Sequence, residues 1–434
     1  MYDRLFRRGY ALLALLSVTL VSCTDDPPVT TDDDVTVPSV YAFTSRFDSA
    51  KSSVDYGGQV VRNLLIQDIS TRARGLATAG ATPVTADELL ALYDYSDASN
   101  LQTSVPTGTI PALERSYSSI STGKNLSGKI SGATLIGTGM TADQAVRAWI
   151  DSLARISSDP TRISTPMGNT TDAGVNLQEM LDKVLNGAVG YYQATGVYLM
   201  NVLDKNNADR ANGTAFHTEM EHNWDEAFGY FGAARNYDDF SDAQLSGAVD
   251  GYVMDVDGDG KIDYTSEFNF SIARYAAKRD VGATTAIDFS GDLFKAFRTG
   301  RALISGLSTR EKIQEQRDII ARTWEKFVAA SAIHYLNGTL ENLATLSDES
   351  VPSNTPSYNK EWSELKGFLY ILQFNPLGAI STSELTELHT LVGDAPLYAE
   401  VGTEPNTSYR TDLMTARTKL QTIFSFTTED VENW

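Results

Sequence analysis

Six helix-capping signals, spread from residue 85 to residue 384, constrain the fold of this chain more than any other feature. In each, a Thr, Asn or Ser stands three residues before a Glu or Gln, the spacing at which the two side chains bond each other's free backbone amides. Each signal precedes an apolar run of helical period, so the pattern predicts an all-α fold, a packed bundle or array of many helices. The pairs are Thr85 with Glu88, Thr141 with Gln144, Asn176 with Glu179, Ser241 with Gln244, Ser308 with Glu311, and Ser381 with Glu384.

Residues that favour helix ends, strands and loops lie between the helical runs and predict where the helices end. The helix after Ser308 should end near Asn337-Gly338, because that pair suits a left-handed helix stop. Strand-like alternation occurs only in residues 37–54, where a short N-terminal β-hairpin can form. The glycines and serines of residues 117–140 predict a long loop.

The N-terminus resembles the signal segment and lipobox of bacterial lipoproteins. Three arginines precede an apolar stretch, residues 11–20, that is too short to span a bilayer, and Leu-Val-Ser-Cys then ends at Cys23, the only cysteine. In such proteins a peptidase cuts before the cysteine, which carries the lipid. We therefore expect residues 1–22 to be a signal peptide and Cys23 to be lipidated; an ordinary secretory signal with an incidental cysteine is the alternative.

Charge separates a tether from the body and excludes one class of partner. Residues 23–39 are rich in Asp, Thr and Pro and predict an extended acidic tether, followed by a helical body over residues 40–434 that can divide into two packed subdomains. The formal net charge of −21 argues against nucleic acid as a partner, because phosphate binding needs clusters of Lys and Arg. We expect the chain at the cell envelope, anchored in the outer membrane, with the side that it faces left open.

Residues 255–263, Asp-Val-Asp-Gly-Asp-Gly-Lys-Ile-Asp, carry the most specific chemical signal of the body. Their alternating carboxylates resemble an EF-hand calcium loop, with helices expected at 243–254 and 267–277. The loop departs from that pattern at its twelfth position, where Ser266 stands one place before the glutamate. A structural Ca²⁺ site is expected, and a solvated acidic turn without an ion is the alternative. The expected ligands are Asp255, Asp257, Asp259, the carbonyl of Lys261, Asp263 and Glu267.

A second metal site is suggested by the Glu-Met-Glu-His segment of residues 219–222. A carboxylate three residues before a histidine is the building unit of di-metal helix bundles, but the second unit is missing, and so is His-Glu-x-x-His. The alternative is that His222 bonds a neighbouring carboxylate and that a second histidine, His334, is a satisfied core residue. The candidate ligands of a mononuclear transition-metal site, of unknown metal, are Glu219, His222 and Glu226, with His334 or Glu364 from elsewhere.

Four stretches together resemble the bacterial lipoprotein family named domain of unknown function 4856, over roughly residues 40–430. They are residues 55–62, residues 221–231, residues 324–334, and residues 362–368 with 373–376. The resemblance implies an envelope lipoprotein that often neighbours imelysin-like proteins of iron acquisition, and it supplies no catalytic residues. A distant architectural similarity to the imelysin-like proteins themselves is a further expectation, although their Gly-x-His-x-x-Glu motif is not matched around His222.

These observations favour binding over catalysis, since no complete catalytic set, nucleophile elbow or phosphate loop occurs in the sequence. The leading hypothesis is a lipid-anchored envelope protein with a calcium-stabilised helical body that binds a ligand or an envelope partner, associated with iron or haem acquisition. A rival is a metal-dependent hydrolase or peptidase that uses His222 and neighbouring carboxylates. A third hypothesis is a structural envelope scaffold without a ligand pocket.

Overall fold

The computed structural model of this chain describes residues 35–95, 112–113 and 120–434. Helix accounts for 57% of it and strand for 4%, so the expected all-α class is confirmed. The signal segment, Cys23 and the tether as far as Asp34 lie outside the described residues. Within those residues, none of the helices combines the length and the apolar character that a membrane span needs.

Helices connected by loops and a few short strands follow one another along the described residues. In chain order they are β1 (Thr44–Ser45), β2 (Asp48–Ser52), α1 (Gly57–Gly75), α2 (Ala86–Tyr93), β3 (Ala112–Leu113), α4 (Ala142–Ser157), α5 (Leu177–Leu185), the π-helix η2 (Asn186–Leu199), η3 (Val202–Asp204), η4 (Ala211–Gly213), α6 (Glu219–Phe231), η5 (Tyr237–Asp239), α7 (Asp242–Ser246), β4 (Lys261–Ile262), α8 (Ser271–Val281), α9 (Phe289–Ser305), α10 (Arg310–Leu343), η6 (Pro352–Asn354), α11 (Pro356–Leu372), α12 (Thr382–Val392), α13 (Glu404–Phe424) and α14 (Thr428–Asn433).

Most of the expected capping signals begin helices. Asn176 caps α5 by accepting hydrogen bonds from the amides of Gln178 and Glu179. The helix α10 differs, since it begins at Arg310 with Thr309 as its N-cap in place of Ser308. Complete capping boxes begin α2 at Thr85, α4 at Thr141, α7 at Ser241 and α12 at Ser381.

The expected stop of α10 at Asn337-Gly338 is wrong, because the helix continues to Leu343. Both residues serve contacts between elements instead. The Asn337 side-chain amide donates to the carbonyl of Val431 at 2.7 Å. A Cβ at Gly338 would lie 2.6 Å from a carboxylate oxygen of Glu361, so the side chain of this α11 residue occupies the space beside the glycine.

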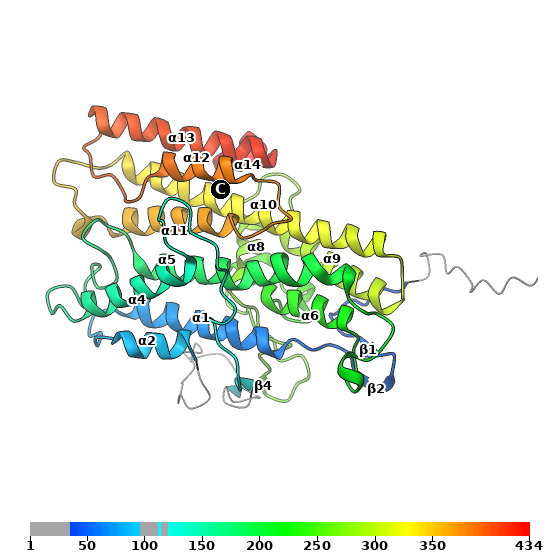
Figure 1. The fold of residues 1–434 in the computed structure, drawn as a ribbon. Coiled ribbons are helices and arrows are strands. Elements are labelled where there is room, and N and C mark those ends of the chain that lie inside the picture. The colour runs from blue at the N-terminus through cyan, green and yellow to red at the C-terminus, as the bar shows by residue number, and fades with distance from the viewer. Residues whose placement is uncertain (1–34, 96–111, 114–119) are drawn as a thin grey trace, which may run out of the picture. The chain divides into compact units, whose positions relative to one another are not determined.

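The helices lie in successive layers (Figure 1). The central pair α10 and α11 is covered on one side by α12 and α13 and on the other by α5 with η2. Helices α1 and α6 pack on the far side of η2, and α9 contacts both α6 and α10. Tryptophans fill the joints between layers: Trp324 of α10 contacts Phe231 of α6 and Tyr191 of η2, and its side chain is fully buried.

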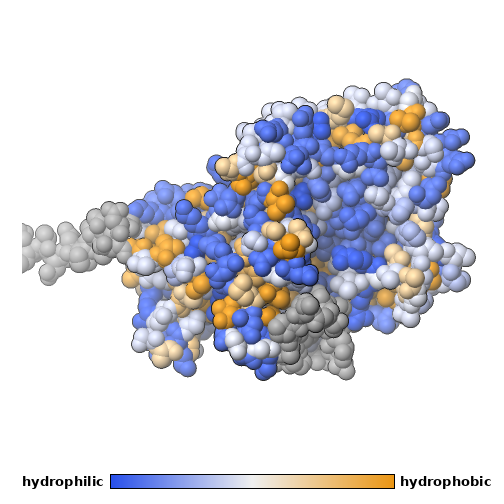
Figure 2. Space-filling model, turned by 180° about the vertical axis from the view of Figure 1, so that it is seen from behind, coloured by the Kyte–Doolittle hydropathy of each residue, from blue (hydrophilic) through white to orange (hydrophobic). Residues whose placement is uncertain are grey.

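The strands are short and stand at the margin of the helices. β1 and β2 pair antiparallel, which confirms the expected N-terminal hairpin. β3 pairs with β4 in parallel, Ala112 opposite Lys261, and so ties the loop around residue 255 to the segment that follows α2. The face shown in Figure 2 is mostly hydrophilic, with apolar residues in small groups, because the large apolar side chains are used in the core.

Candidate functional site

The loop expected to bind calcium curls around its first carboxylate. Asp255 accepts hydrogen bonds from the amides of Gly258 and Gly260, both at 2.8 Å. Both glycines have left-handed backbone, with φ of 77° and 80°, which permits the tight turn. Ile262 is fully buried and fixes the end of the loop on the core.

Three of the expected calcium ligands converge. One carboxylate oxygen each of Asp255, Asp257 and Glu267 lie within 4.8 Å of one another. Glu267 is buried, and its carboxylate accepts from the amides of Val256 and Asp263, each at 2.8 Å. The carboxylates of Asp259 and Asp263 lie outside that group and accept instead from the amides of Lys261 and Thr265.

The helix-loop-helix setting expected for this loop is wrong. Helix α7 ends at Ser246, where Gly247 takes a left-handed backbone, and α8 begins only at Ser271. The residues between them are mostly turns and bends, and Val253 pairs with Phe268 in an isolated antiparallel bridge across the loop. The loop is therefore held by a bridge and a short strand pair in place of two helices.

The residues of the second expected metal site do not all meet. Glu219 and Glu226 lie on α6 with His222, whose Nε2 is 3.8 Å from a carboxylate oxygen of Glu226. His334 lies on α10, where its Nδ1 is 2.6 Å from the carbonyl of Trp434, and burial lowers its pKa to about 4. The histidine beside His222 is His217, with a ring centroid 4.5 Å away.

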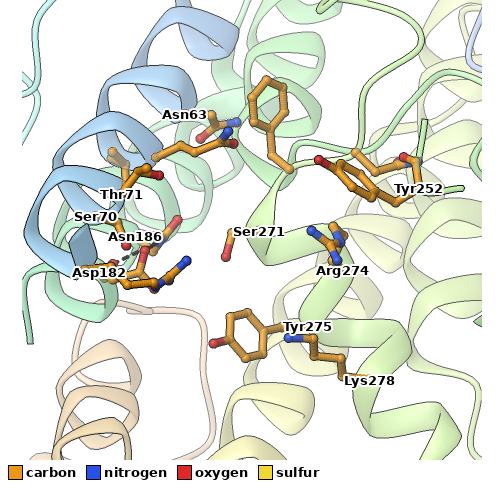
Figure 3. Close-up of a pocket in the computed structure, with 15 residues that line it drawn as sticks. Asn63, Ser70, Thr71, Asp182, Asn186, Tyr252, Ser271, Arg274, Tyr275 and Lys278 are labelled. Atoms are coloured by element: carbon orange, nitrogen blue, oxygen red, sulfur yellow. Dashed lines mark hydrogen bonds between the residues drawn. The ribbon is translucent and has the colours of Figure 1, made fainter. Parts of the chain in front are cut away.

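A polar cavity of about 550 Å³ opens between α1, α8 and the junction of α5 with η2 (Figure 3). Helix α1 turns one face toward it, and the polar residues of that face follow one another at steps of four, three, one and three residues. From the opposite side α8 contributes Ser271, Arg274, Tyr275 and Lys278, and the α5–η2 junction contributes Asp182 and Asn186. The lining residues of the α1 face are the polar Asn63, Gln67, Ser70, Thr71 and Arg74 and the apolar Ile66.

Three cations line this cavity: Arg74, Arg274 and Lys278. Within the described parts of the chain, none of them forms an ion pair with a carboxylate. The guanidinium of Arg274 stacks over Tyr252 at 4.1 Å, and burial lowers its pKa. Burial, reinforced by the charges of Arg274 and Lys183, lowers the pKa of Lys278 to about 8. The cavity thus holds the desolvated cations Arg274 and Lys278 and the exposed cation Arg74, and the one carboxylate that lines it, Asp182, is bonded to Lys183.

A buried ion cluster fixes the wall of the cavity. The ammonium of Lys183 donates to Glu179 and Asp182, both at 2.9 Å, and lies 3.4 Å from Glu364. It also lies 5.3 Å from the ring centre of Tyr275, which lines the cavity. Glu364 therefore lies beside Lys183, and it is not part of the metal site expected around His222.

The α1 face has a sequence signal, since its polar residues recur at helical spacing, whereas nothing local shows that α8 lies opposite.

No curated protein and no solved structure matches the chain. The model of one protein family matches residues 38–387 of this sequence, which is most of the chain. The protein therefore belongs to the family described as domain of unknown function (DUF4856).

Proposed function

We propose that this protein is a lipid-anchored envelope protein whose helical body binds a small anionic molecule in the cavity between α1 and α8. The proposal rests on three cations that have no carboxylate partner among the described residues, Arg74, Arg274 and Lys278, in a chain of net charge −21. In such an acidic protein a carboxylate partner is easy to supply. Leaving three cations unpaired around one cavity favours a ligand that brings the negative charge itself.

The rest of the lining defines the ligand further. Amide and hydroxyl side chains of α1, among them Asn63 and Ser70, can hydrogen-bond a polar ligand, and Tyr252 and Tyr275 offer aromatic surface. Carboxylate or phosphate groups on a compact polar body fit this chemistry. Ferric complexes of polycarboxylates and the propionates of haem share it, so a role in iron or haem acquisition is included in the proposal.

Binding should depend on the cations of α8. We expect isothermal titration of the full-length chain with inorganic phosphate, citrate, ferric citrate and haemin to show at least one binder. In Arg274→Gln and in Lys278→Gln its affinity should fall by about 10-fold or more, since each removes one charge-assisted contact. Affinity should also fall as the pH rises from 7 to 9, because Lys278, with a pKa of about 8, then loses its proton.

Lys326→Gln is the matched control, because Lys326 is an exposed lysine of α10 that does not line the cavity. It should bind as the parent does. Affinities that are equal in the parent and in both α8 variants would refute the proposed site. Binding of haemin or ferric citrate alone would support the iron role, and binding of phosphate or citrate alone would remove it.

We also propose that Ca²⁺ stabilises the loop of residues 255–267. Asp255, Asp257 and Glu267 bring three carboxylates together, and a hard divalent cation would relieve their repulsion. Calcium at 100 times its dissociation constant should then raise the free energy of unfolding by about 2.7 kcal/mol. Asp257→Ala should lose this gain and leave the calcium-free stability nearly unchanged, as thermal melting with Ca²⁺ or with chelator will show.

The control for calcium is Asp250→Ala, an exposed acidic residue just outside the loop. It should keep the full response. A parent protein that melts at the same temperature with and without calcium would contradict the calcium proposal and leave the anion site untouched.

A further inference from the structure

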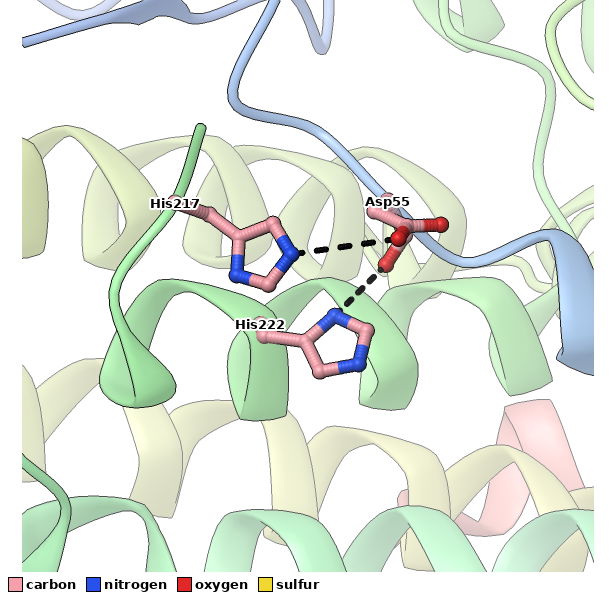
Figure 4. A group of neighbouring side chains, drawn as sticks. All are labelled: Asp55, His217 and His222. Atoms are coloured by element: carbon pink, nitrogen blue, oxygen red, sulfur yellow. Dashed lines mark hydrogen bonds and ion pairs between the residues drawn. The ribbon is translucent and has the colours of Figure 1, made fainter. Parts of the chain in front are cut away.

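Two histidines that are close in the sequence, His217 and His222, meet the distant Asp55 in front of the N-terminal end of α6. His217 precedes the helix, His222 lies in its first turns, and Asp55 comes from the segment before α1 (Figure 4). One side-chain ligand atom of each lies within 4.8 Å of the others. None of the three lines the cavity between α1 and α8, so this site is independent of the anion site.

Both rings direct a nitrogen atom toward Asp55 (Figure 4). Nε2 of His217 is 3.8 Å from a carboxylate oxygen of Asp55, and Nδ1 of His222 is 3.1 Å from the main-chain oxygen of the same residue. The first distance is too long for a hydrogen bond. Two ligand atoms on one tetrahedral metal lie about 3.3 Å apart, given metal–ligand bonds of about 2.0 Å, so the ligand atoms, which lie within 4.8 Å of one another, would have to move inward on binding.

In each ring, the nitrogen atom that faces away from the centre lies near an oxygen atom of the protein. Nδ1 of His217 is 3.1 Å from the carbonyl of Thr218, and a carbonyl only accepts, so this nitrogen carries the proton and leaves Nε2 with its lone pair. Nε2 of His222 is 3.8 Å from the carboxylate of Glu226, likewise beyond hydrogen-bond distance, so Glu226 has to move closer before it can accept a proton. When Nδ1 of His222 binds a metal, its proton moves to Nε2, where Glu226 can accept it.

Glu226 is itself held in place. The side-chain amide of Gln59, on α1, donates to its other carboxylate oxygen at 2.7 Å. A cavity of about 210 Å³ is lined by Asp55, His222 and Glu226, with Arg62, Lys124 and Lys129 on its other side, and His217 lies outside its lining. It leaves room for water or a further ligand on the metal, so the site has three protein ligands and an open position.

We propose that Asp55, His217 and His222 bind one divalent transition-metal ion, zinc or iron(II), with Glu226 as a positioning residue. Two imidazoles and one carboxylate are the ligand set that these ions prefer, whereas Ca²⁺ and Mg²⁺ take oxygen ligands. The set differs from the one expected from the sequence, since His217 and Asp55 take the places given to His334 and Glu219.

The test is metal titration of the full-length chain after removal of bound metals, in excess Ca²⁺ so that the acidic loop is filled. Zn²⁺ should bind with one equivalent by calorimetry, and Co²⁺, added as a spectroscopic probe, should give visible bands of nitrogen coordination. Fe²⁺ titrated without oxygen distinguishes the two candidate metals by affinity. In Asp55→Ala, His217→Ala and His222→Ala the affinity should fall by more than the roughly 10- to 100-fold that loss of an outer partner costs.

Two further variants distinguish the proposed metal ligands from residues that only lie near them. Glu226→Gln should weaken Zn²⁺ roughly 10-fold and keep the nitrogen-coordinated cobalt bands, since it removes the partner of His222 and no ligand. Glu219→Gln, an exposed residue in the first turn of α6, should bind as the parent does. Melting of each metal-free variant shows whether it is folded.

The proposal fails if the parent binds no zinc at millimolar concentration, or if His217→Ala and His222→Ala keep the affinity of the parent. It also fails if only Glu219→Gln loses the metal. Absence of zinc binding with normal anion binding would show that these histidines have no metal-binding role, and the function proposed for the other cavity would stand.

Discussion

Arg301→Met should lower the free energy of unfolding by about 3–5 kcal/mol at pH 7. The side chain of Arg301 is fully buried on α9. Its guanidinium donates to Asp225 at 2.8 Å and to Glu221 at 3.0 Å, both on α6, and to the hydroxyl of Ser53 at 2.8 Å. Without it, two buried carboxylates lose their closest positive partner, and each must stay charged in the core or take up a proton.

Denaturant unfolding measures this loss, with Lys295→Met as the control, an exposed cation on the same helix that should change stability by less than about 1 kcal/mol. The triple variant Arg301→Met, Asp225→Asn, Glu221→Gln separates two costs: that of burying two unpaired carboxylates and that of losing the packing contacts of the Arg301 side chain. It should be more stable than Arg301→Met alone, because neutral side chains cost less to bury. An Arg301→Met protein as stable as the parent would show that the ion pairs of Arg301 with Asp225 and Glu221 contribute nothing to the stability of the fold.

Helix starts could be predicted because a cap involves residues three apart. Thr85 and Ser381 form their boxes as the spacing indicates. The same rule applied to Thr218 and Glu221 also predicts the start of α6, which the six signals do not include. The stop at Gly338 failed because an Asn-Gly pair permits a helix end without enforcing one, and α10 continues through it to Leu343.

In the calcium loop, too, the local part of the structure could be predicted from the sequence and the part that depends on more distant residues could not. The convergence of Asp255 and Asp257 follows from local alternation and two left-handed glycines. The flanking structure depends on the pairing of Val253 with Phe268, on the far side of the loop, which the helical spacing of the flanks does not show.

Both candidate sites combine local and distant information. The polar stripe of α1 has helical spacing, so one wall of the cavity can be predicted from the sequence. Its charge comes largely from α8, about 200 residues later, and only packing through Lys183 and Tyr275 sets that wall opposite. Asp55 likewise joins His217 and His222 across more than 160 residues, so no spacing rule reveals that group.

Lys183→Met should also cost about 3–5 kcal/mol at pH 7, and the cost should shrink in acid. Burial alone would raise the pKa of Glu179, but the Lys183 ammonium holds it below its usual range. A carboxylate with a lowered pKa contributes stability above its unfolded value, and that stability is lost only as the pH falls through the lower folded value. In the variant the cation is gone, so burial raises the pKa of Glu179 instead.

The variant therefore takes up a proton at Glu179 at a pH where the parent remains ionised, and its deficit should fall by about 1.4 kcal/mol per pH unit over that range. Denaturant unfolding of both proteins at pH 7 and pH 5 measures the change. Lys183→Met with Glu179→Gln should recover part of the loss at pH 7 and show a weaker dependence on pH. An equal deficit at both pH values would mean that Lys183 acts through packing on Tyr275 and Phe368 and not by balancing buried charge.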